Sequence, residues 1–291
     1  MMKYALFALM LVSLYTGNSV QAACLNAKVL GQGQAILLMP GFVSDERVWQ
    51  PLAKALAKNY QVHQLSIAGF GKNPACEQAK TIYPQVIAEL KQYVSKTELE
   101  RPIFVGHSMG GLIAFELALS DTLPLVAAIS IDGLPFIGPI FTRTNDTTVE
   151  DLNYQAKSIQ QLYQNADAKQ LKLMTQQGVA IQTKDESRYK DIIEMAATSD
   201  PTTAANAIYT VLTTDLRSEL AKLKTPMLLI GASGGFTQPE QHEAIKALYQ
   251  AQLVQTKQIE LKMNSQGRHF LMWDQPQWLI DKITQFIKEQ A

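Results

Sequence analysis

The segment that most restricts the fold of this 291-residue chain is a short apolar run that turns sharply into an apolar helix. The run PIFVG (102–106) leads into GHSMGG (106–111), which contains the pattern G-x-S-x-G, and a helical pattern continues to residue 120. The glycines leave room for a turn so tight that Ser108 takes a strained backbone conformation. The pattern therefore predicts a nucleophilic hydroxyl on Ser108, raised above the edge of a sheet. We expect the Met109 N–H, at the helix N-terminus, to face the oxyanion that develops when Ser108 attacks a carbonyl.

Apolar strand-like runs alternate with helical patterns on both sides of this turn. The alternation indicates an α/β fold with a mostly parallel central sheet and helices on both faces. The expected strands lie at 27–30, 35–39, 60–67, 102–106, 125–132, 227–231 and 258–263. The expected helices lie at 47–59, 81–97, 109–120, 239–251 and 274–288. We interpret the first two strands, which the turn GQGQ joins, as a strand pair.

The alternation stops between residues 134 and 224, where helical segments such as 148–165, 184–198 and 200–213 follow one another. Because the strand rhythm resumes afterwards, this stretch is predicted to be a helical cap inserted into one domain. Its apolar and aromatic side chains either line a pocket or pack the cap on the core. These candidates are Phe136, Ile137, Ile140, Phe141, Leu162 and Tyr163. The expected division is 1–22 signal peptide, 23–133 first part of the core, 134–224 cap and 225–291 second part of the core.

The N-terminus has the layout of a secretory signal peptide. A short basic start at 1–3 precedes the apolar run YALFALMLVSLYTG, and small residues around Val20-Gln21-Ala22 provide a cleavage site. We therefore expect an exported protein, periplasmic or secreted. Lipid attachment through Cys24, directly after QAA, is the alternative. No later segment is long and apolar enough to span a membrane, so no transmembrane segment is expected in the mature chain.

Composition excludes several classes of partner and site. Lysine plus arginine and aspartate plus glutamate number 26 each, so the chain lacks the basic surplus of a nucleic-acid-binding protein. The two cysteines are too far apart in sequence for a metal site, and no histidine cluster accompanies them. No metal or organic cofactor is expected, and the oligomeric state is left open.

A serine hydroxyl needs a base to become a nucleophile, and the chain has only four histidines. His107 lies inside the turn and is expected to point away from Ser108 and to pack the turn. His63 lies in an expected strand and His242 on an expected helix. His269 lies on a loop between the last expected strand and the last expected helix, which can return above the sheet edge. By elimination and position, His269 is the predicted base.

Taken together, these parts resemble an α/β-hydrolase of the capped, esterase/lipase-like kind. The resemblance extends over nearly all of residues 27–290 and is carried by MPGFVSDERVW, SIAGFGKNP, the serine turn, SIDGLPF, the cap and the histidine loop. It implies that the residue after the glycine of the first loop, here Phe42, donates the second oxyanion N–H. The chain departs from the commonest pattern in having Pro40 where a histidine often precedes that glycine.

The resemblance also implies an acid, usually placed after the strand that matches MLLIG and in some members one strand earlier. Residues 232–238, ASGGFTQ, contain no carboxylate. Asp132 ends the strand after the serine helix, at the sheet edge that carries Ser108, and is the predicted acid. The alternative for Asp132 is a cap or turn at the entry to the insertion. Glu240 is the competing acid, although the first turn of a helix explains its charge by the helix dipole alone.

In a fold of this kind the strand at 27–30 lies antiparallel beside the strand at 60–67, so Cys24 and Cys76 approach each other. A disulfide between them is expected, with two free thiols as the alternative.

The expected function is hydrolysis of a small-molecule acyl ester by a Ser108–His269–Asp132 triad through an acyl-enzyme, with the Phe42 and Met109 amides as oxyanion hole. Three alternatives remain: an acyltransferase or thioesterase with the same triad, a ligand-binding homologue without useful turnover, and a peptidase.

Overall fold

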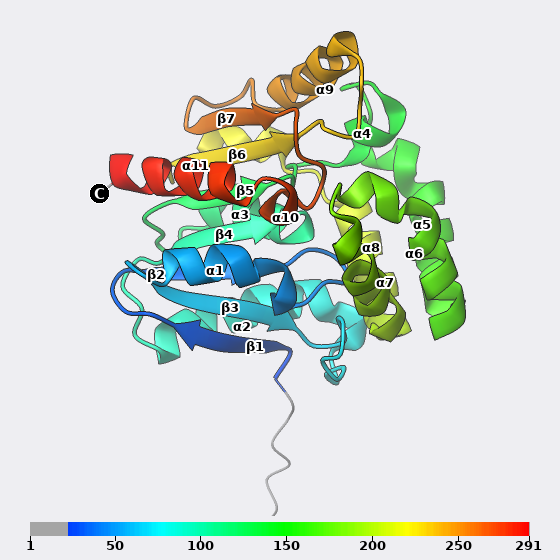
Figure 1. Cartoon of the computed structure of the whole chain (residues 1–291), viewed down its shortest axis with the longest axis horizontal. Coiled ribbons are helices and arrows are strands. Elements are labelled where there is room, and N and C mark those ends of the chain that lie inside the picture. Colours follow the sequence, from blue (N-terminus) through cyan, green and yellow to red (C-terminus); the bar gives the residue numbers. More distant parts are fainter. Residues whose placement is uncertain (1–22, 291) are drawn as a thin grey trace, which may run out of the picture.

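A seven-stranded sheet forms the centre of the protein in the computed structural model, which describes residues 23–290 (Figure 1). The predicted signal peptide at 1–22 lies outside the described residues. The strands are β1 (Leu25–Leu30), β2 (Ala35–Met39), β3 (Gln61–Ile67), β4 (Ile103–His107), β5 (Ala128–Ile131), β6 (Met227–Ala232) and β7 (Ile259–Asn264). Their order is β1-β3-β2-β4-β5-β6-β7, with β1 antiparallel and every other pair parallel. The predicted mostly parallel sheet is confirmed.

The pairing of the first two strands is corrected by this order. We interpreted 27–30 and 35–39 as a strand pair, but β3 lies between β1 and β2. The reason is that β2 pairs with β3 and with β4, so it has no free edge for β1. β1 instead runs antiparallel to β3, from Leu25 opposite Ile67 to Leu30 opposite Val62. The turn GQGQ therefore carries the chain past β3 instead of closing a hairpin.

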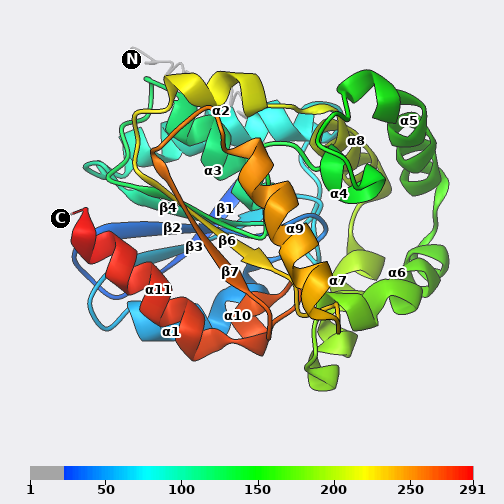
Figure 2. The ribbon, with the colours of Figure 1, turned by 90° about the horizontal axis from the view of Figure 1, so that it is seen from above.

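Helices cover both faces of the sheet (Figure 2). Alternate strand residues belong to the two separate cores on these faces. Leu37 and Met39 of β2 join a core with α2 (Ile82–Lys96), α3 (Met109–Leu119) and α9 (Pro239–Gln252). Ile36 and Leu38 join a second core with α1 (Gln50–Leu56), α10 (Leu271–Asp274) and α11 (Pro276–Glu289). Short 3-10 turns lie at Glu46–Trp49 and Ala79–Thr81. Because both of their faces are buried, central strands such as β2 (AILLM) are continuous apolar runs, whereas the edge strands β1 and β7 are partly exposed and contain polar residues.

Five helices lie between β5 and β6, at the carboxyl ends of the parallel strands, and we call them the cap (Figure 2). They are α4 (Gly138–Thr142), α5 (Val149–Asn165), α6 (Ala168–Gln182), α7 (Tyr189–Thr198) and α8 (Pro201–Thr213), with 3-10 turns at Glu186–Arg188 and Arg217–Lys222. Helix α6 was not among the helical segments predicted from the sequence. Its sequence signal is a capping box, in which Asp167 accepts from the Gln170 amide and Gln170 accepts in return from the Asp167 amide. None of the helices in residues 23–290 meets the length and hydropathy that a membrane span requires.

Cys24 and Cys76 form a disulfide with their Cα atoms 5.2 Å apart. The bridge joins the start of β1 to the segment after β3, and the Ala68 amide donates to the Cys24 carbonyl at 2.9 Å. Both cysteines are buried against the core that contains α2. The bond therefore fixes the antiparallel edge of the sheet to the first long loop.

Replacing both cysteines with alanine should lower the free energy of unfolding by about 2–4 kcal/mol. The bridge closes a loop of 52 residues, so its loss gives the unfolded chain more conformational freedom while the core packing stays. Urea unfolding of the oxidised protein and of the double variant measures the difference. An identical midpoint and slope for the two proteins would contradict it, and the unmodified protein under reducing conditions serves as the control for the substitutions.

Candidate active site

The serine turn joins the end of β4 to the start of α3. Ser108 lies between them with φ 54° and ψ −114°, a conformation that L-residues rarely adopt. A Cβ on Gly106 would lie 1.8 Å from the Gly110 carbonyl oxygen, so residue 106 must be glycine for the turn to close. The turn thus directs the Ser108 side chain from the carboxyl edge of the sheet, and the Met109 amide is the first of α3, where N–H groups lack a partner within the helix.

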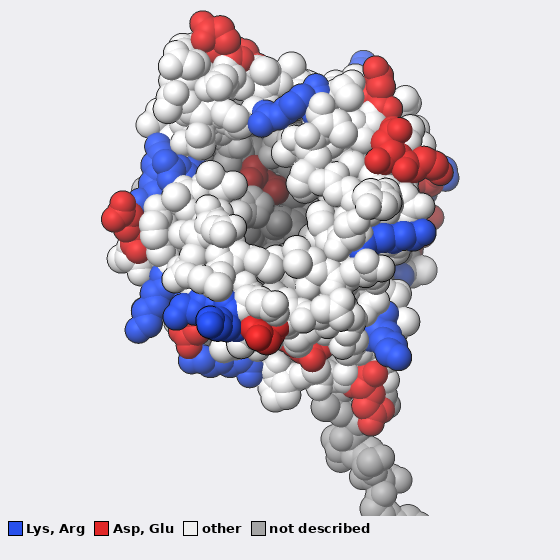
Figure 3. All heavy atoms as spheres, turned by 90° about the vertical axis from the view of Figure 1, so that its right-hand side faces the viewer, with Lys and Arg blue, Asp and Glu red and all other residues white. Residues whose placement is uncertain are grey.

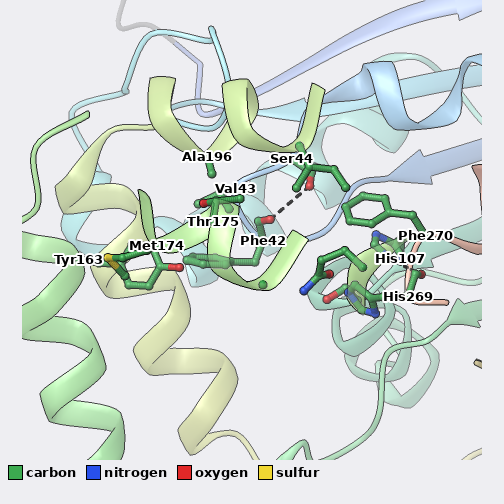
Figure 4. Close-up of a pocket in the computed structure, with 14 residues that line it drawn as sticks. Phe42, Val43, Ser44, His107, Tyr163, Met174, Thr175, Ala196, His269 and Phe270 are labelled. Carbon is green, nitrogen blue, oxygen red and sulfur yellow. Dashed lines mark hydrogen bonds between the residues drawn. The ribbon is translucent and has the colours of Figure 1, made fainter. Parts of the chain in front are cut away.

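The loop after β2 approaches this turn closely. A Cβ on Gly41 would lie 2.9 Å from the Ser108 Cβ, which explains the glycine at that position. Phe42 follows, and its carbonyl accepts a hydrogen bond from the Ser44 hydroxyl at 3.2 Å (Figure 4). Phe42, Ser108 and His269 line the same cavity, whose volume is about 310 Å³. The structure therefore brings the predicted nucleophile, the predicted base and Phe42, one of the two predicted oxyanion residues, to one site.

His269 forms its side-chain hydrogen bond with Asp132, at 2.6 Å between Nδ1 and Oδ2. The other oxygen of Asp132, Oδ1, accepts from the Ala232 amide at 2.8 Å and from the Tyr249 hydroxyl at 2.7 Å. Burial raises the pKa of Tyr249 well above its usual value, and the Asp132 charge adds to that, so the phenol stays a donor. Asp132 is thus held as an acceptor by three groups, and its carboxylate fixes which histidine nitrogen carries the proton.

The end of β6, where the resemblance would usually place an acid, has a different role in this structure. The Ala232 amide at that point donates to Asp132. Glu240 is exposed in the first turn of α9. Between the two carboxylates considered from the sequence, the structure brings Asp132 and not Glu240 to His269.

The other three histidines of the chain form hydrogen bonds with other groups. His107 is buried with Nε2 3.0 Å from the His269 carbonyl oxygen. His63 is buried on β3, with Nδ1 2.6 Å from the Tyr93 hydroxyl. His242 on α9 has Nδ1 2.8 Å from the Ser233 hydroxyl. Burial lowers the pKa of His107 well below its usual value, and the neighbouring His269 lowers it further. His107 is therefore neutral in the fold and supports the main chain of the histidine loop.

The stability of the protein should fall as pH drops below about 6.5, the pKa of an unfolded histidine. Because the folded pKa of His107 is lowered, the unfolded chain binds the proton first, so its contribution is present above that pH and lost below it. Between pH 6 and 5 the unfolding free energy of the variant His107→Gln should depend less steeply on pH. The reduction in slope should correspond to at most about one proton taken up on unfolding. Chemical denaturation at stepped pH measures it. Parallel slopes for the two proteins would rule out this role for His107.

The cavity draws its cap residues from three helices. Tyr163 comes from α5, Met174, Thr175, Gly178 and Gln182 come from α6, and Ile192 and Ala196 come from α7. Of the six side chains that the sequence analysis offered, Tyr163 lines this cavity, whereas Phe136 is fully buried and Phe141 is half exposed. The Tyr163 ring also meets the Phe42 ring edge to face, with centroids 5.1 Å apart. The α6 residues were missed because α6 itself was not identified.

Hydrogen bonds tie the C-terminal end of α6 to the loop that carries the histidine. The Asp274 carboxylate accepts from the Thr183 hydroxyl at 2.5 Å and from the Arg268 amide at 2.7 Å. The Phe270 amide donates to the Gln182 carbonyl at 2.8 Å, and the Arg268 guanidinium donates to the Thr183 carbonyl at 3.2 Å. The residues on both sides of the predicted base are thus bonded to the cap.

Across residues 23–290, no three or more His, Cys, Asp or Glu side chains are grouped so that they could hold a metal ion. The cavity lining is a mixture of aromatic, aliphatic and uncharged polar side chains with the two histidines. The cavity brings the Ser108 hydroxyl near the His269 imidazole, which is bonded to the Asp132 carboxylate.

Comparison with known proteins agrees with this geometry. Residues 34–276 match the profile of a family described as alpha/beta hydrolase fold. A pimeloyl-[acyl-carrier protein] methyl ester esterase from Pseudoalteromonas atlantica is 26% identical over 205 residues, which cover 70% of this chain and 76% of that protein.

Two solved structures share the fold at lower identity. The enol-lactonase from Burkholderia xenovorans LB400 superposes with a TM-score of 0.71 and 17% identity, covering 92% of this chain and 99% of its own. An esterase from Exiguobacterium antarcticum superposes with a TM-score of 0.72 and 14% identity, covering 91% of this chain and 95% of its own.

Proposed function

Because this chain belongs to the α/β-hydrolase fold family, we propose that it hydrolyses carboxylic esters through an acyl-enzyme formed on Ser108. The relative from Pseudoalteromonas atlantica is named as a methyl ester esterase, which supports ester hydrolysis as the reaction. The observation that carries the proposal is the 2.6 Å bond between His269 Nδ1 and Asp132 Oδ2, in a cavity that Ser108 also lines. A histidine held by a carboxylate in this way can act as the base that makes a serine hydroxyl nucleophilic, which supports the proposal.

The proposed reaction has two halves. In the first, the Ser108 Oγ attacks the ester carbonyl carbon while its proton moves to Nε2 of His269, and the Phe42 and Met109 amides hold the oxyanion. The C–O bond to the alcohol then breaks, and the alcohol leaves with the proton from His269. In the second half, water gives a proton to His269 and attacks the acyl carbon, which releases the carboxylic acid and returns the proton to Ser108. Asp132 holds the histidine tautomer and stabilises the imidazolium in both halves.

The test is turnover of p-nitrophenyl acetate by the mature protein, followed by trapping of the intermediate. We expect release of p-nitrophenol and, after rapid acid quench, a peptide containing Ser108 that carries one acetyl group. Methanol added as a competing acceptor separates hydrolysis from acyl transfer, because a transferase would form mostly methyl acetate. No turnover above buffer with intact, folded protein would overturn the proposal in favour of a ligand-binding homologue.

We further propose that the protein is exported after removal of residues 1–22. The Cys24–Cys76 disulfide supports an oxidising compartment, where such bonds persist. Lipid attachment would use the sulfur of Cys24, so it competes with that bond. The mass of the protein purified from the producing cells tests this: a chain that begins at Ala23 and is two hydrogens short of its reduced mass supports export with the disulfide, and an added lipid mass contradicts it.

A further inference from the structure

A second cavity adjoins the candidate active site on the cap side. Its volume is about 560 Å³, and it lies between α5 and α6. Met174 lines both this cavity and the one that contains Ser108 and His269. Figure 4 shows Met174 and Tyr163 at the end of the inner cavity away from His269. The two spaces therefore meet at one flexible, apolar side chain.

Helical periodicity explains why Met174 belongs to both. On α6, positions 170, 173, 174 and 177 form one stripe that faces the outer cavity, and positions 174, 175, 178 and 182 form the stripe that faces the inner one. On α5, positions 158, 161, 162 and 165 form the opposite wall of the outer cavity. Met174 stands where the two α6 stripes cross and is the one residue common to the two linings.

Uncharged side chains line the outer cavity: Leu162, Ala166, Leu173 and Met174 are apolar, and Ser158, Gln161, Asn165, Gln170 and Gln177 are polar. Leu162 and Leu173 line it from opposite helices and are each 51% exposed, which leaves two large apolar side chains in contact with water. Among the described residues that line either cavity there is no Lys, Arg, Asp or Glu. The cap side is hollowed near its centre, with charged side chains mostly around the edge of the face and some acidic atoms visible in the depth (Figure 3). Burial of an apolar ligand chain there would be favourable, whereas an anionic chain finds no partner in the lining.

We propose that this groove binds an unbranched, uncharged hydrocarbon chain of the ester whose carbonyl reacts at Ser108, and that Met174 is the passage between the two cavities. The inference rests on the proposed function and deepens it by naming the substrate class. The chain extends from the reacting carbonyl past Tyr163 and Met174 into the space between α5 and α6. The class is thus neutral esters with a medium or long aliphatic chain.

The test compares two homologous series on the mature protein. One varies the acyl chain, from p-nitrophenyl acetate through butyrate and hexanoate to octanoate, and the other varies the alcohol chain, from methyl to octyl acetate. We expect kcat/KM to rise with chain length in one series, by up to about fourfold for each added methylene that becomes buried. The series that rises identifies which side of the ester occupies the groove. A flat profile in both series would overturn the proposal.

Variants of residues where the two cavities meet supply the second part of the test. In the series whose kcat/KM rises with chain length, Met174→Trp should lower the ratio of kcat/KM for the longest ester to that for the shortest by about tenfold or more, because the indole fills the passage. Leu173→Asp, at a half-exposed groove position that does not line the inner cavity, should lower the same ratio by placing a charge beside the chain. Ile181→Trp is the matched control, since Ile181 is a 67% exposed residue of α6 that lines neither cavity, and its ratio should match the unmodified protein.

Failure of the inference and failure of the proposed function give different results. If acetate is turned over in a Ser108-dependent way but the ratio is unchanged by both Met174→Trp and Leu173→Asp, the groove is not part of the substrate site and the esterase proposal stands. If no ester in either series is turned over, both proposals fall.

Discussion

Ser108→Ala should lower kcat for p-nitrophenyl acetate by about 10⁴- to 10⁶-fold. The hydroxyl that forms the acyl-enzyme is lost, and what remains is the catalysis by the oxyanion amides and by substrate binding. The stability should stay nearly the same, because serine and alanine both carry a Cβ at φ 54° and the strain of the turn is unchanged. Steady-state kinetics and thermal unfolding of the same preparation measure the two effects together.

Ser44→Ala is a matched control for this substitution. Ser44 lines the same cavity, but its hydroxyl is bonded to the Phe42 carbonyl, so most of the activity should remain. Equal losses in Ser44→Ala and Ser108→Ala would show that the reaction does not depend on a nucleophile at the turn. Retention of the acetylated peptide in Ser108→Ala would move the nucleophile to another residue.

Asp132→Asn should lower kcat by about 10³- to 10⁴-fold with little change in KM. The side-chain amide introduced by this substitution would present N–H groups to His269 Nδ1, which then becomes an acceptor and leaves the proton on Nε2. That tautomer cannot take the proton from Ser108, and the imidazolium loses its counter-charge. The substitution is conservative for the fold, because the amide oxygen can still accept from the Ala232 amide and the Tyr249 hydroxyl.

Glu240→Gln separates the two candidate acids. Glu240 is exposed at the start of α9, so the variant should keep the activity of the unmodified protein. Loss of its charge should lower the stability of the helix slightly. If Glu240→Gln loses its activity while Asp132→Asn keeps it, the acid lies after β6 and the observed His269–Asp132 bond is not needed for catalysis. The measurement is kcat/KM on acetate for both variants at one pH.

The parts of the site that could be predicted from the sequence are those with short-range signals. The turn at Ser108 is recognisable because strand, turn and helix are contiguous, and Asp132 and His269 follow because both stand just after a strand. Parallel strands bring their carboxyl ends to one edge, so residues in these places meet whatever the helices between them do. The structure brings the two side chains together, and their catalytic roles stay predictions.

Other parts depend on packing that no local pattern records. Tyr249 lies 117 residues from the carboxylate that it contacts, and its buried position on α9 is indistinguishable in sequence from ordinary core packing. The inner stripe of α6 mixes a methionine, a threonine, a glycine and a glutamine, so it lacks the apolar periodicity that would mark a buried face. The order β1-β3-β2 likewise depends on β3 and β4 taking both edges of β2, whereas the GQGQ turn alone favours a hairpin.

The bonds between the end of α6 and the histidine loop couple the cap to the predicted base. The Gln182–Phe270 and Thr183–Asp274 bonds hold the chain after His269, and the bond from the Arg268 guanidinium to the Thr183 carbonyl holds the residue before it. Opening of the C-terminal turn of α6 would break these bonds and release the loop that carries His269. By linkage, a ligand that contacts α6 and favours the bonded arrangement would also favour the arrangement in which His269 meets Asp132.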